Sequence, residues 1–137
     1  MLMLGSSMLA LLGPSGCTSE ATPPVYPVEG SAFYRGQPAT DARIYLHPVD
    51  STHAPSTRPN GVVDSSGMFR ISTYREFDGA PPGSYRLSII WRSESVREDG
   101  ENAGPDRLGS RYFDAKKNPW TVTVGPGTNH IDALELK

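Results

Sequence analysis

The sequence predicts an all-β fold: a single antiparallel β-sandwich of about seven strands that follows an N-terminal signal segment. Several short runs alternate apolar and polar residues with a period of two, which is typical of strands that bury one face. The chain contains 14 glycines and 13 prolines in 137 residues, and many of them stand between these runs, where turns need them. This surplus disfavours long helices, and no segment shows a convincing helical pattern.

The expected strands follow one another along the chain, each between turn residues. The final run changes phase, which predicts a bulge near Ala133-Leu134. Turns are expected at 35–38, at Asn60-Gly61, at 64–67, at Asp78-Gly79, at 81–83 and at 125–127. The alternating runs are 28–34, 42–47, 68–73, 84–91, 120–124 and 129–136.

Composition excludes several classes of protein. The 13 Lys and Arg residues nearly balance the 15 Asp and Glu residues, and no basic block occurs, so we expect no nucleic-acid partner. The single cysteine excludes a disulfide-stapled scaffold and a Cys-rich zinc module. The length allows one domain, or one domain with a tail.

The N-terminal segment 1–16 has no charged and no aromatic residue, and it is too short to span a bilayer. It ends in small residues directly before the only cysteine, Cys17, and therefore resembles the lipobox of bacterial lipoproteins. The resemblance implies cleavage before Cys17 and attachment of lipid, palmitate included, to its thiol and new N-terminus. Pro14 replaces the usual Leu, and no basic residue precedes the apolar run. An ordinary cleaved signal and an apolar tail are the alternatives.

This interpretation divides the chain into a signal peptide at 1–16, a Pro-rich tether at 17–27 and the sandwich domain at 28–137. Two long loops interrupt the domain. The segment 47–59 is rich in Pro, Ser and Thr, and the segment 92–111 is strongly charged. Such compositions bury little apolar surface, so we expect both loops to be mobile.

The order of motifs resembles the carboxypeptidase regulatory-like domain, a transthyretin-like sandwich of Greek-key type. The resemblance rests on Val28-x-Gly30-x-Ala32-x-Tyr34-x-Gly36-x-Pro38 with Ala42-x-Ile44-x-Leu46, on Asp64-Ser65-Ser66-Gly67-Met68-Phe69 and on Gly83-x-Tyr85-x-Leu87. It implies a non-catalytic accessory domain that acts as a spacer, a folding aid or a contact surface. That inference is by analogy of fold.

Catalytic signatures do not stand out. His47, His53 and His130 lack the close spacing that places two ligands on one metal. The acids Asp64, Glu76, Asp78 and Asp114 suggest calcium as an alternative, but aspartates in such turns are expected to bond backbone amides. We therefore expect no catalytic residue, no metal and no cofactor. The alternative is a hydrolase or metal-assisted enzyme that gathers His47, His130 and turn carboxylates into one site.

Partner contact is the expected role of the domain. The candidate contact residues are Arg43 and Tyr45 on an outward strand face, and Tyr112 and Phe113 after the charged loop. Trp91 and Trp120 fall in the inward phase and are expected in the core; if they were exposed, they would favour a secreted glycan-binding module. The sequence thus predicts an exported protein, lipid-anchored at the cell membrane or outer membrane and facing the periplasm or the surface. Its sandwich is expected to serve as a binding or structural module, with an unidentified envelope protein or glycan as the partner.

Overall fold

A computed structural model describes residue 13 and residues 23–50, 57–93 and 104–137. The predictions for the signal segment, for Cys17, for the first part of the tether, for His53 and for the middle of the charged loop lie outside the described residues. Within the described part, no helix is long and apolar enough to span a bilayer.

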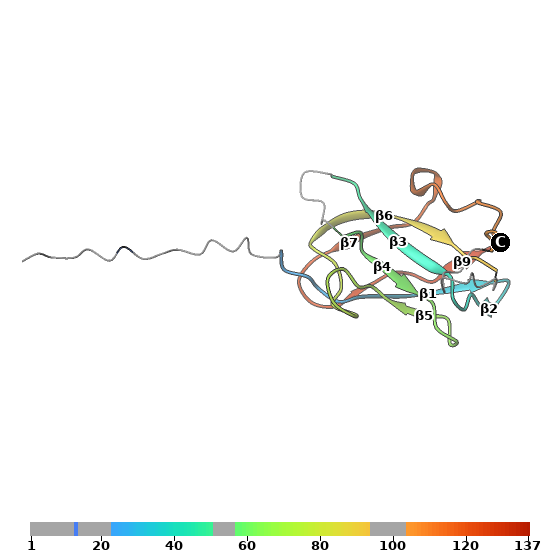
Figure 1. The fold of residues 1–137 in the computed structure, drawn as a ribbon, viewed down its shortest axis with the longest axis horizontal. Coiled ribbons are helices and arrows are strands. Elements are labelled where there is room, and N and C mark those ends of the chain that lie inside the picture. The colour runs from blue at the N-terminus through green and yellow to red at the C-terminus, as the bar shows by residue number, and fades with distance from the viewer. Residues whose placement is uncertain (1–12, 14–22, 51–56, 94–103) are drawn as a thin grey trace, which may run out of the picture.

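Two β-sheets pack face to face in the described part of the chain, which confirms the all-β sandwich (Figure 1). The only helical element described is the short 3₁₀ turn η2 (Ala115–Lys117). The strands are β1 (Val28–Tyr34), β2 (Gln37–Pro38), β3 (Arg43–Pro48), β4 (Asn60–Val62), β5 (Met68–Arg70), β6 (Gly83–Ile90), β7 (Thr121–Val124), β8 (Asn129–His130) and β9 (Leu134–Leu136).

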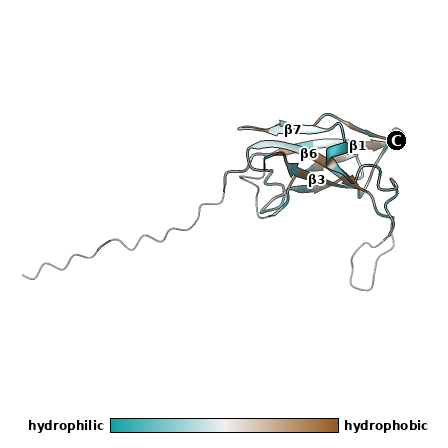
Figure 2. Cartoon of the chain, turned by 90° about the horizontal axis from the view of Figure 1, so that it is seen from above, coloured by the Kyte–Doolittle hydropathy of each residue, from teal (hydrophilic) through white to brown (hydrophobic). Residues whose placement is uncertain are grey.

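The four-stranded sheet is antiparallel throughout and has the order β4-β3-β6-β7. Its inner face carries alternate residues of β3 and β6, including Ile44, Leu46, Leu87 and Ile89, which are all fully buried. Figure 2 shows hydrophobic and hydrophilic residues alternating along these strands. This alternation is the period-two pattern that the sequence displays.

The second sheet is built around β1, which pairs with neighbours on both sides. Glu29 is opposite both Arg70 of β5 and His130 of β8, and Tyr34 is opposite both Gln37 of β2 and Leu136 of β9. Strands β5 and β2 therefore lie end to end along one side of β1, and β8 and β9 along the other. If two short strands that lie end to end are taken as one, this sheet has three strand positions and the opposite sheet has four. The total agrees with a sandwich of about seven strands.

The core lies between the sheets, and Gly30 of β1 is one of its tightest points. A β-carbon at this position would lie 2.6 Å from Cζ of Phe69 and 3.0 Å from Cβ of Ile131. Glycine is therefore required because side chains from both flanks of β1, Phe69 of β5 and Ile131 directly after β8, cover its backbone. Phe69 is only 2% exposed and Ile131 is 7% exposed.

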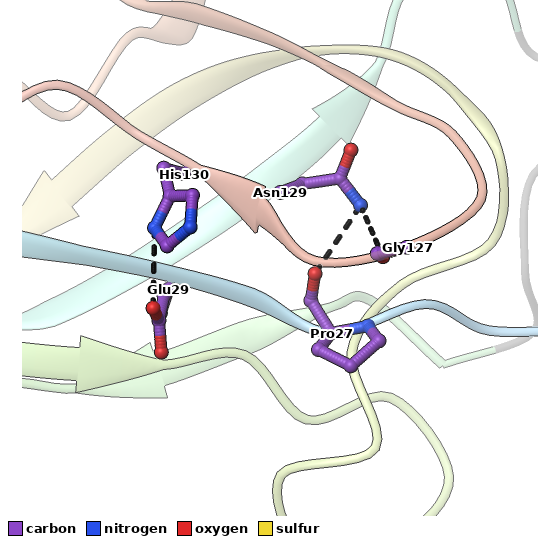
Figure 3. A network of polar contacts seen from close by, with 5 residues as sticks. All are labelled: Pro27, Glu29, Gly127, Asn129 and His130. Carbon is purple, nitrogen blue, oxygen red and sulfur yellow. Dashed lines mark hydrogen bonds and ion pairs between the residues drawn. The ribbon is translucent and has the colours of Figure 1, made fainter.

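The two ends of the domain differ. Tyr26 forms two backbone hydrogen bonds with Ala80, and the side-chain amide of Asn129 donates to the carbonyl oxygens of Pro27 and Gly127 at 3.2 Å each (Figure 3). Because β9 runs parallel to β1, the C-terminus lies at the end opposite to this entry of the chain (Figure 1). Tyr26 and Pro27, which the sequence assigns to the tether, are thus bonded to the sandwich.

Two sequence predictions about the strands are wrong. Asn60-Gly61 was expected as a turn but begins strand β4, where a β-carbon on Gly61 would lie 2.6 Å from the carbonyl oxygen of Arg70. The glycine serves a close approach of two backbones rather than a turn. The last run was expected as an antiparallel strand with a bulge; it is two short strands, β8 and β9, separated at 131–133 and both parallel to β1.

Replacing Gly30 by alanine should destabilise the domain, because its methyl group overlaps the ring of Phe69. We expect a loss of about 1–3 kcal/mol in the free energy of unfolding, measured by urea denaturation. Gly125→Ala is the matched control, since no atom lies within 4 Å of its β-carbon, and it should change the free energy by less than about 0.5 kcal/mol. Equal stability of the two variants would contradict the packing described for β1.

Candidate functional site

A loop that is hydrogen-bonded to strand β6 at both of its ends forms part of the surface of the four-stranded sheet. The amide of Ile89 donates to the carbonyl oxygen of Tyr112 at 3.0 Å, and the amide of Leu87 donates to that of Trp120 at 3.2 Å. Residues 112–120 therefore meet β6 through backbone hydrogen bonds at both of their ends, Tyr112 and Trp120. We call this segment the 112–120 loop.

Asn118 closes this loop. Its side chain is 6% exposed, and its amide nitrogen donates to the carbonyl oxygens of Leu87 and Tyr112, both at 2.9 Å. A buried amide that satisfies two carbonyl groups fixes the loop to the sheet, because leaving these groups unpaired would cost about 1–3 kcal/mol each. At the top of the loop, the carboxylate of Asp114 accepts a hydrogen bond from the amide of Lys116 and caps η2.

An open cleft of about 680 Å³ lies between the 112–120 loop and the four-stranded sheet, and we call it the Phe113 cleft. The Phe113 side chain is 63% exposed and that of Val49 is 56% exposed, so the cleft offers apolar surface to solvent. The residues that line it are His47, Pro48, Val49, Arg86, Phe113, Asp114, Ala115 and Lys116.

Cationic groups outnumber anionic groups in the Phe113 cleft. Arg86 projects from β6 and Lys116 from η2, while Asp114 is the one carboxylate among the described residues that line the cleft. The arrangement combines an exposed aromatic ring with two positive charges. Such a surface can bind a ligand that has both an apolar face and a negative charge.

His47 forms the floor of this cleft. Its Nε2 lies 2.7 Å from Oγ of Ser88, a residue that is only 5% exposed. Burial lowers the pKa of His47 below its usual 6.5, the positive charge of Arg58 lowers this pKa further, and the carboxylate of Asp114 opposes the shift. His47 is therefore mainly neutral at pH 7, and its ring exchanges a hydrogen bond with the hydroxyl group of Ser88.

The four predicted contact residues have different surroundings. Phe113 lines the cleft, while the Tyr112 ring packs on Trp120 with centroids 5.1 Å apart and its hydroxyl group accepts from the amide of Lys137. Arg43 projects from β3 and donates to the side chain of Asn60 at 3.4 Å. Tyr45 is half-buried on the same strand, and neither Arg43 nor Tyr45 lines the Phe113 cleft.

The two tryptophans are not equivalent. Trp91 is 6% exposed and its indole nitrogen donates to the carbonyl oxygen of Thr40 at 2.8 Å, as a core residue would. Trp120 is only partly buried and packs against the core. The expectation of a core position is thus confirmed for Trp91 and holds in part for Trp120.

His47 shares the Phe113 cleft with the turn acid Asp114, but the other described histidine, His130, lies in the opposite sheet. His47 belongs to the four-stranded sheet, whereas Nδ1 of His130 lies 3.1 Å from Oε1 of Glu29 in the other sheet (Figure 3). Among the described residues, no three His, Cys, Asp or Glu side chains group so that they could hold a metal ion.

The turn aspartates are occupied by hydrogen bonds. The carboxylate of Asp64 accepts from the amides of Ser66 and Met68 and from the Ser66 hydroxyl group, and the hydroxyl bond makes the largest contribution to lowering its pKa. Asp78 accepts from the amides of Thr73, Tyr74 and Arg75. These two carboxylates stabilise their turns, as the sequence suggested for acids at such positions.

Sequence reasoning identified Phe113 but missed Val49 and Lys116 as parts of the same surface. Lys116 lies three residues from Phe113, yet nothing in the sequence shows that a 3₁₀ turn places both over β3 and β6. Arg86 could be recognised as an outward residue from the alternation of β6 alone.

No family model and no curated protein matches the chain. Among solved structures, the chain is similar to a 9R-lipoxygenase from Cyanothece PCC8801, with a TM-score of 0.45 and 17% sequence identity. The similarity covers 96% of this chain but only 18% of the lipoxygenase chain. A likeness at this level carries no argument about function.

The environment of His47 predicts a pH dependence. The folded state disfavours its charged form, so the stability that His47 contributes is present above pH 6.5 and is lost as the pH falls through its lower folded-state pKa. NMR titration of the ring should give a pKa below 6.5, and Arg58→Gln should raise it. A pKa at or above 6.5 in the unmodified protein would contradict the burial described here.

Proposed function

We propose that this chain is a non-catalytic, lipid-anchored protein of the bacterial cell envelope whose β-sandwich serves as a binding module, with the Phe113 cleft as its contact surface. The observation that carries the binding role is the exposed ring of Phe113 beside the charges of Arg86 and Lys116 in one cleft. Large apolar side chains left in solvent next to fixed charges are typical of contact surfaces.

The anchor is supported by the order of features along the chain. An uncharged apolar run ends at the only cysteine, Cys17. Tyr26, nine residues later, already forms backbone hydrogen bonds with Ala80 of the described domain. The residues between Cys17 and Tyr26 include Pro23 and Pro24, which favour an extended spacer. Two acyl chains on the cysteine would hold such a domain at a membrane surface, because each buried CH₂ group contributes about 0.8 kcal/mol.

The resemblance to carboxypeptidase regulatory-like domains supports an accessory rather than a catalytic role. The Asp64–Phe69 motif forms the turn into β5, and the Gly83–Leu87 motif forms the first part of β6. In the described residues both motifs serve the scaffold, through a turn carboxylate and through the buried side chains of Tyr85 and Leu87. The proposed contact surface is formed by other residues.

A secreted glycan-binding module is the second candidate, and the exposed ring of Phe113 favours it as well, since aromatic rings stack on sugars. It would use the same cleft but would lack the anchor. The buried position of Trp91 removes that side chain as a stacking platform.

The anchor is tested by intact mass spectrometry of the protein isolated from a bacterial host. We expect an N-terminus at Cys17 that carries diacylglycerol, and we expect Cys17→Ser to remain unmodified and to leave the membrane fraction. A free thiol on an uncut chain would refute the lipoprotein proposal, whereas cleavage without lipid would support the secreted alternative.

The cleft is tested with 8-anilinonaphthalene-1-sulfonate, a probe that joins an aromatic face to a negative charge. Phe113→Ala and Lys116→Gln should each weaken the dye's affinity severalfold, up to about tenfold, measured by fluorescence titration. Phe77→Ala is the matched control, because Phe77 is also exposed, at 45%, but lies in another cleft. Unchanged binding in both cleft variants would remove the Phe113 cleft as the contact surface.

A further inference from the structure

A second cleft lies at the end of the sandwich away from the entry of the chain, beside the turn between β1 and β2. It is open and has a volume of about 460 Å³. We call it the arginine cleft, because two guanidinium groups, those of Arg35 and Arg107, stand in its wall. The other lining residues are Tyr34, Gln37, Pro38, Thr40, Asp41 and Trp91.

The guanidinium group of each arginine of this cleft lies over an aromatic ring. The guanidinium carbon of Arg107 lies 3.9 Å from the centroid of the Trp91 ring, and that of Arg35 lies 5.1 Å from the centroid of Tyr34. The two rings meet edge to face, with centroids 5.7 Å apart. The four side chains thus form a continuous row, arginine–aromatic–aromatic–arginine, with a positive charge at each end.

Hydrogen bonds of the surrounding backbone and of Trp91 hold the row in place. Trp91 is 6% exposed and donates its indole N–H to Thr40, so the ring under Arg107 is fixed. The carboxylate of Asp106 accepts from the amides of Trp91, Leu108 and Ser110, which fixes the backbone on both sides of Arg107.

Arg35 is also held in a defined position. It stands in a tight turn with φ +50°, followed by Gly36 with φ +79°, the geometry of a two-residue hairpin turn. The turn is closed by the pairing of Tyr34 with Gln37. A positive φ is unfavourable for an arginine residue. The hairpin turn nevertheless holds Arg35 in this conformation at the edge of the cleft.

A cation–π contact satisfies no N–H donor, so a guanidinium group over a ring can still donate hydrogen bonds to a planar anion. Within the described part of the chain, neither guanidinium group makes a hydrogen bond or an ion pair that would occupy these donors. Gln37, Thr40 and Asp41 add neutral and acidic oxygen atoms around them, which can bond hydroxyl groups.

We propose that the arginine cleft binds an acidic glycan, with a carboxylate or phosphate group on each of Arg35 and Arg107 and with sugar hydroxyl groups on Gln37 and Asp41. The combination favours a sugar over a bare anion, because Asp41 repels a small anion but accepts hydrogen bonds from hydroxyl groups. This site goes beyond the proposed function: it needs neither the Phe113 cleft nor the lipid on Cys17.

A similar stack elsewhere on the domain supplies a control. The guanidinium carbon of Arg70 lies 3.8 Å from the centroid of Phe77, but the cleft around it also contains Glu29 and Asp64. Two carboxylates against one arginine disfavour an anionic ligand there. Arg70→Gln therefore removes an equivalent stacked arginine without touching the proposed site.

The test is calorimetric titration of the full chain carrying Cys17→Ser, at low ionic strength, with oligogalacturonate, glucose 6-phosphate, maltohexaose and inorganic phosphate. We expect binding of at least one acidic sugar, weaker binding of inorganic phosphate and none of maltohexaose. Preference between the two acidic sugars identifies carboxylate or phosphate as the recognised group. The Arg35→Gln/Arg107→Gln variant should lose affinity by roughly tenfold or more, and Arg70→Gln should retain it.

Two further variants keep the test informative if removal of Arg107 disturbs Trp91. Arg35→Gln alone changes only an exposed turn and should still weaken binding severalfold, while Arg107→Lys keeps the charge but loses the flat, two-pronged donor and should also weaken it. Equal affinity of the unmodified and doubly substituted proteins would overturn the proposal. So would absence of binding to both acidic sugars, or inorganic phosphate binding as tightly as the sugars.

Discussion

The two-sided pairing of β1 is the constraint on which the described structure depends. Four short strands, β2, β5, β8 and β9, are two or three residues long and pair only with β1 among the named strands of their sheet. Strands of this length are not stable by themselves, so their positions follow from the register of β1. Gly30 allows this arrangement, because its missing side chain leaves room for Phe69 from one flank and Ile131 from the other.

The two clefts share one principle of construction, in which a polar side chain that is at least partly buried fixes an exposed loop through several hydrogen bonds. Asn118 holds the 112–120 loop above the four-stranded sheet and thereby presents Phe113. Asp106 holds the segment that carries Arg107 against Trp91. In both cases the scaffold supplies precision and the loop supplies the chemical groups, which is how binding residues are commonly distributed in β-sandwiches.

The sequence was sufficient for local features and insufficient for relations between distant segments. Alternation correctly located β1, β3, β6 and β7, because burial of one face leaves a period-two pattern. It could not reveal that β8 and β9 run parallel to β1, since periodicity does not identify a partner. Asn60-Gly61 has the composition of a turn, but its glycine is explained by a neighbouring backbone. Phe113 could be found in sequence, whereas the row from Arg35 to Arg107 joins residues from opposite halves of the chain.

The parallel pairing of β9 with β1 also bears on how the molecule acquires its fold. The first and the last strand of the domain are neighbours, so the sheet around β1 is incomplete until the residues near Leu136 are present. The entropy cost of closing a loop of this length precedes the stabilising contacts that the closure allows. β-Sandwiches with such distant pairings therefore fold in roughly milliseconds to seconds. Until residues 129–136 are present, one flank of β1 has open hydrogen-bonding groups, which makes the nascent chain most prone to aggregation just before these residues emerge.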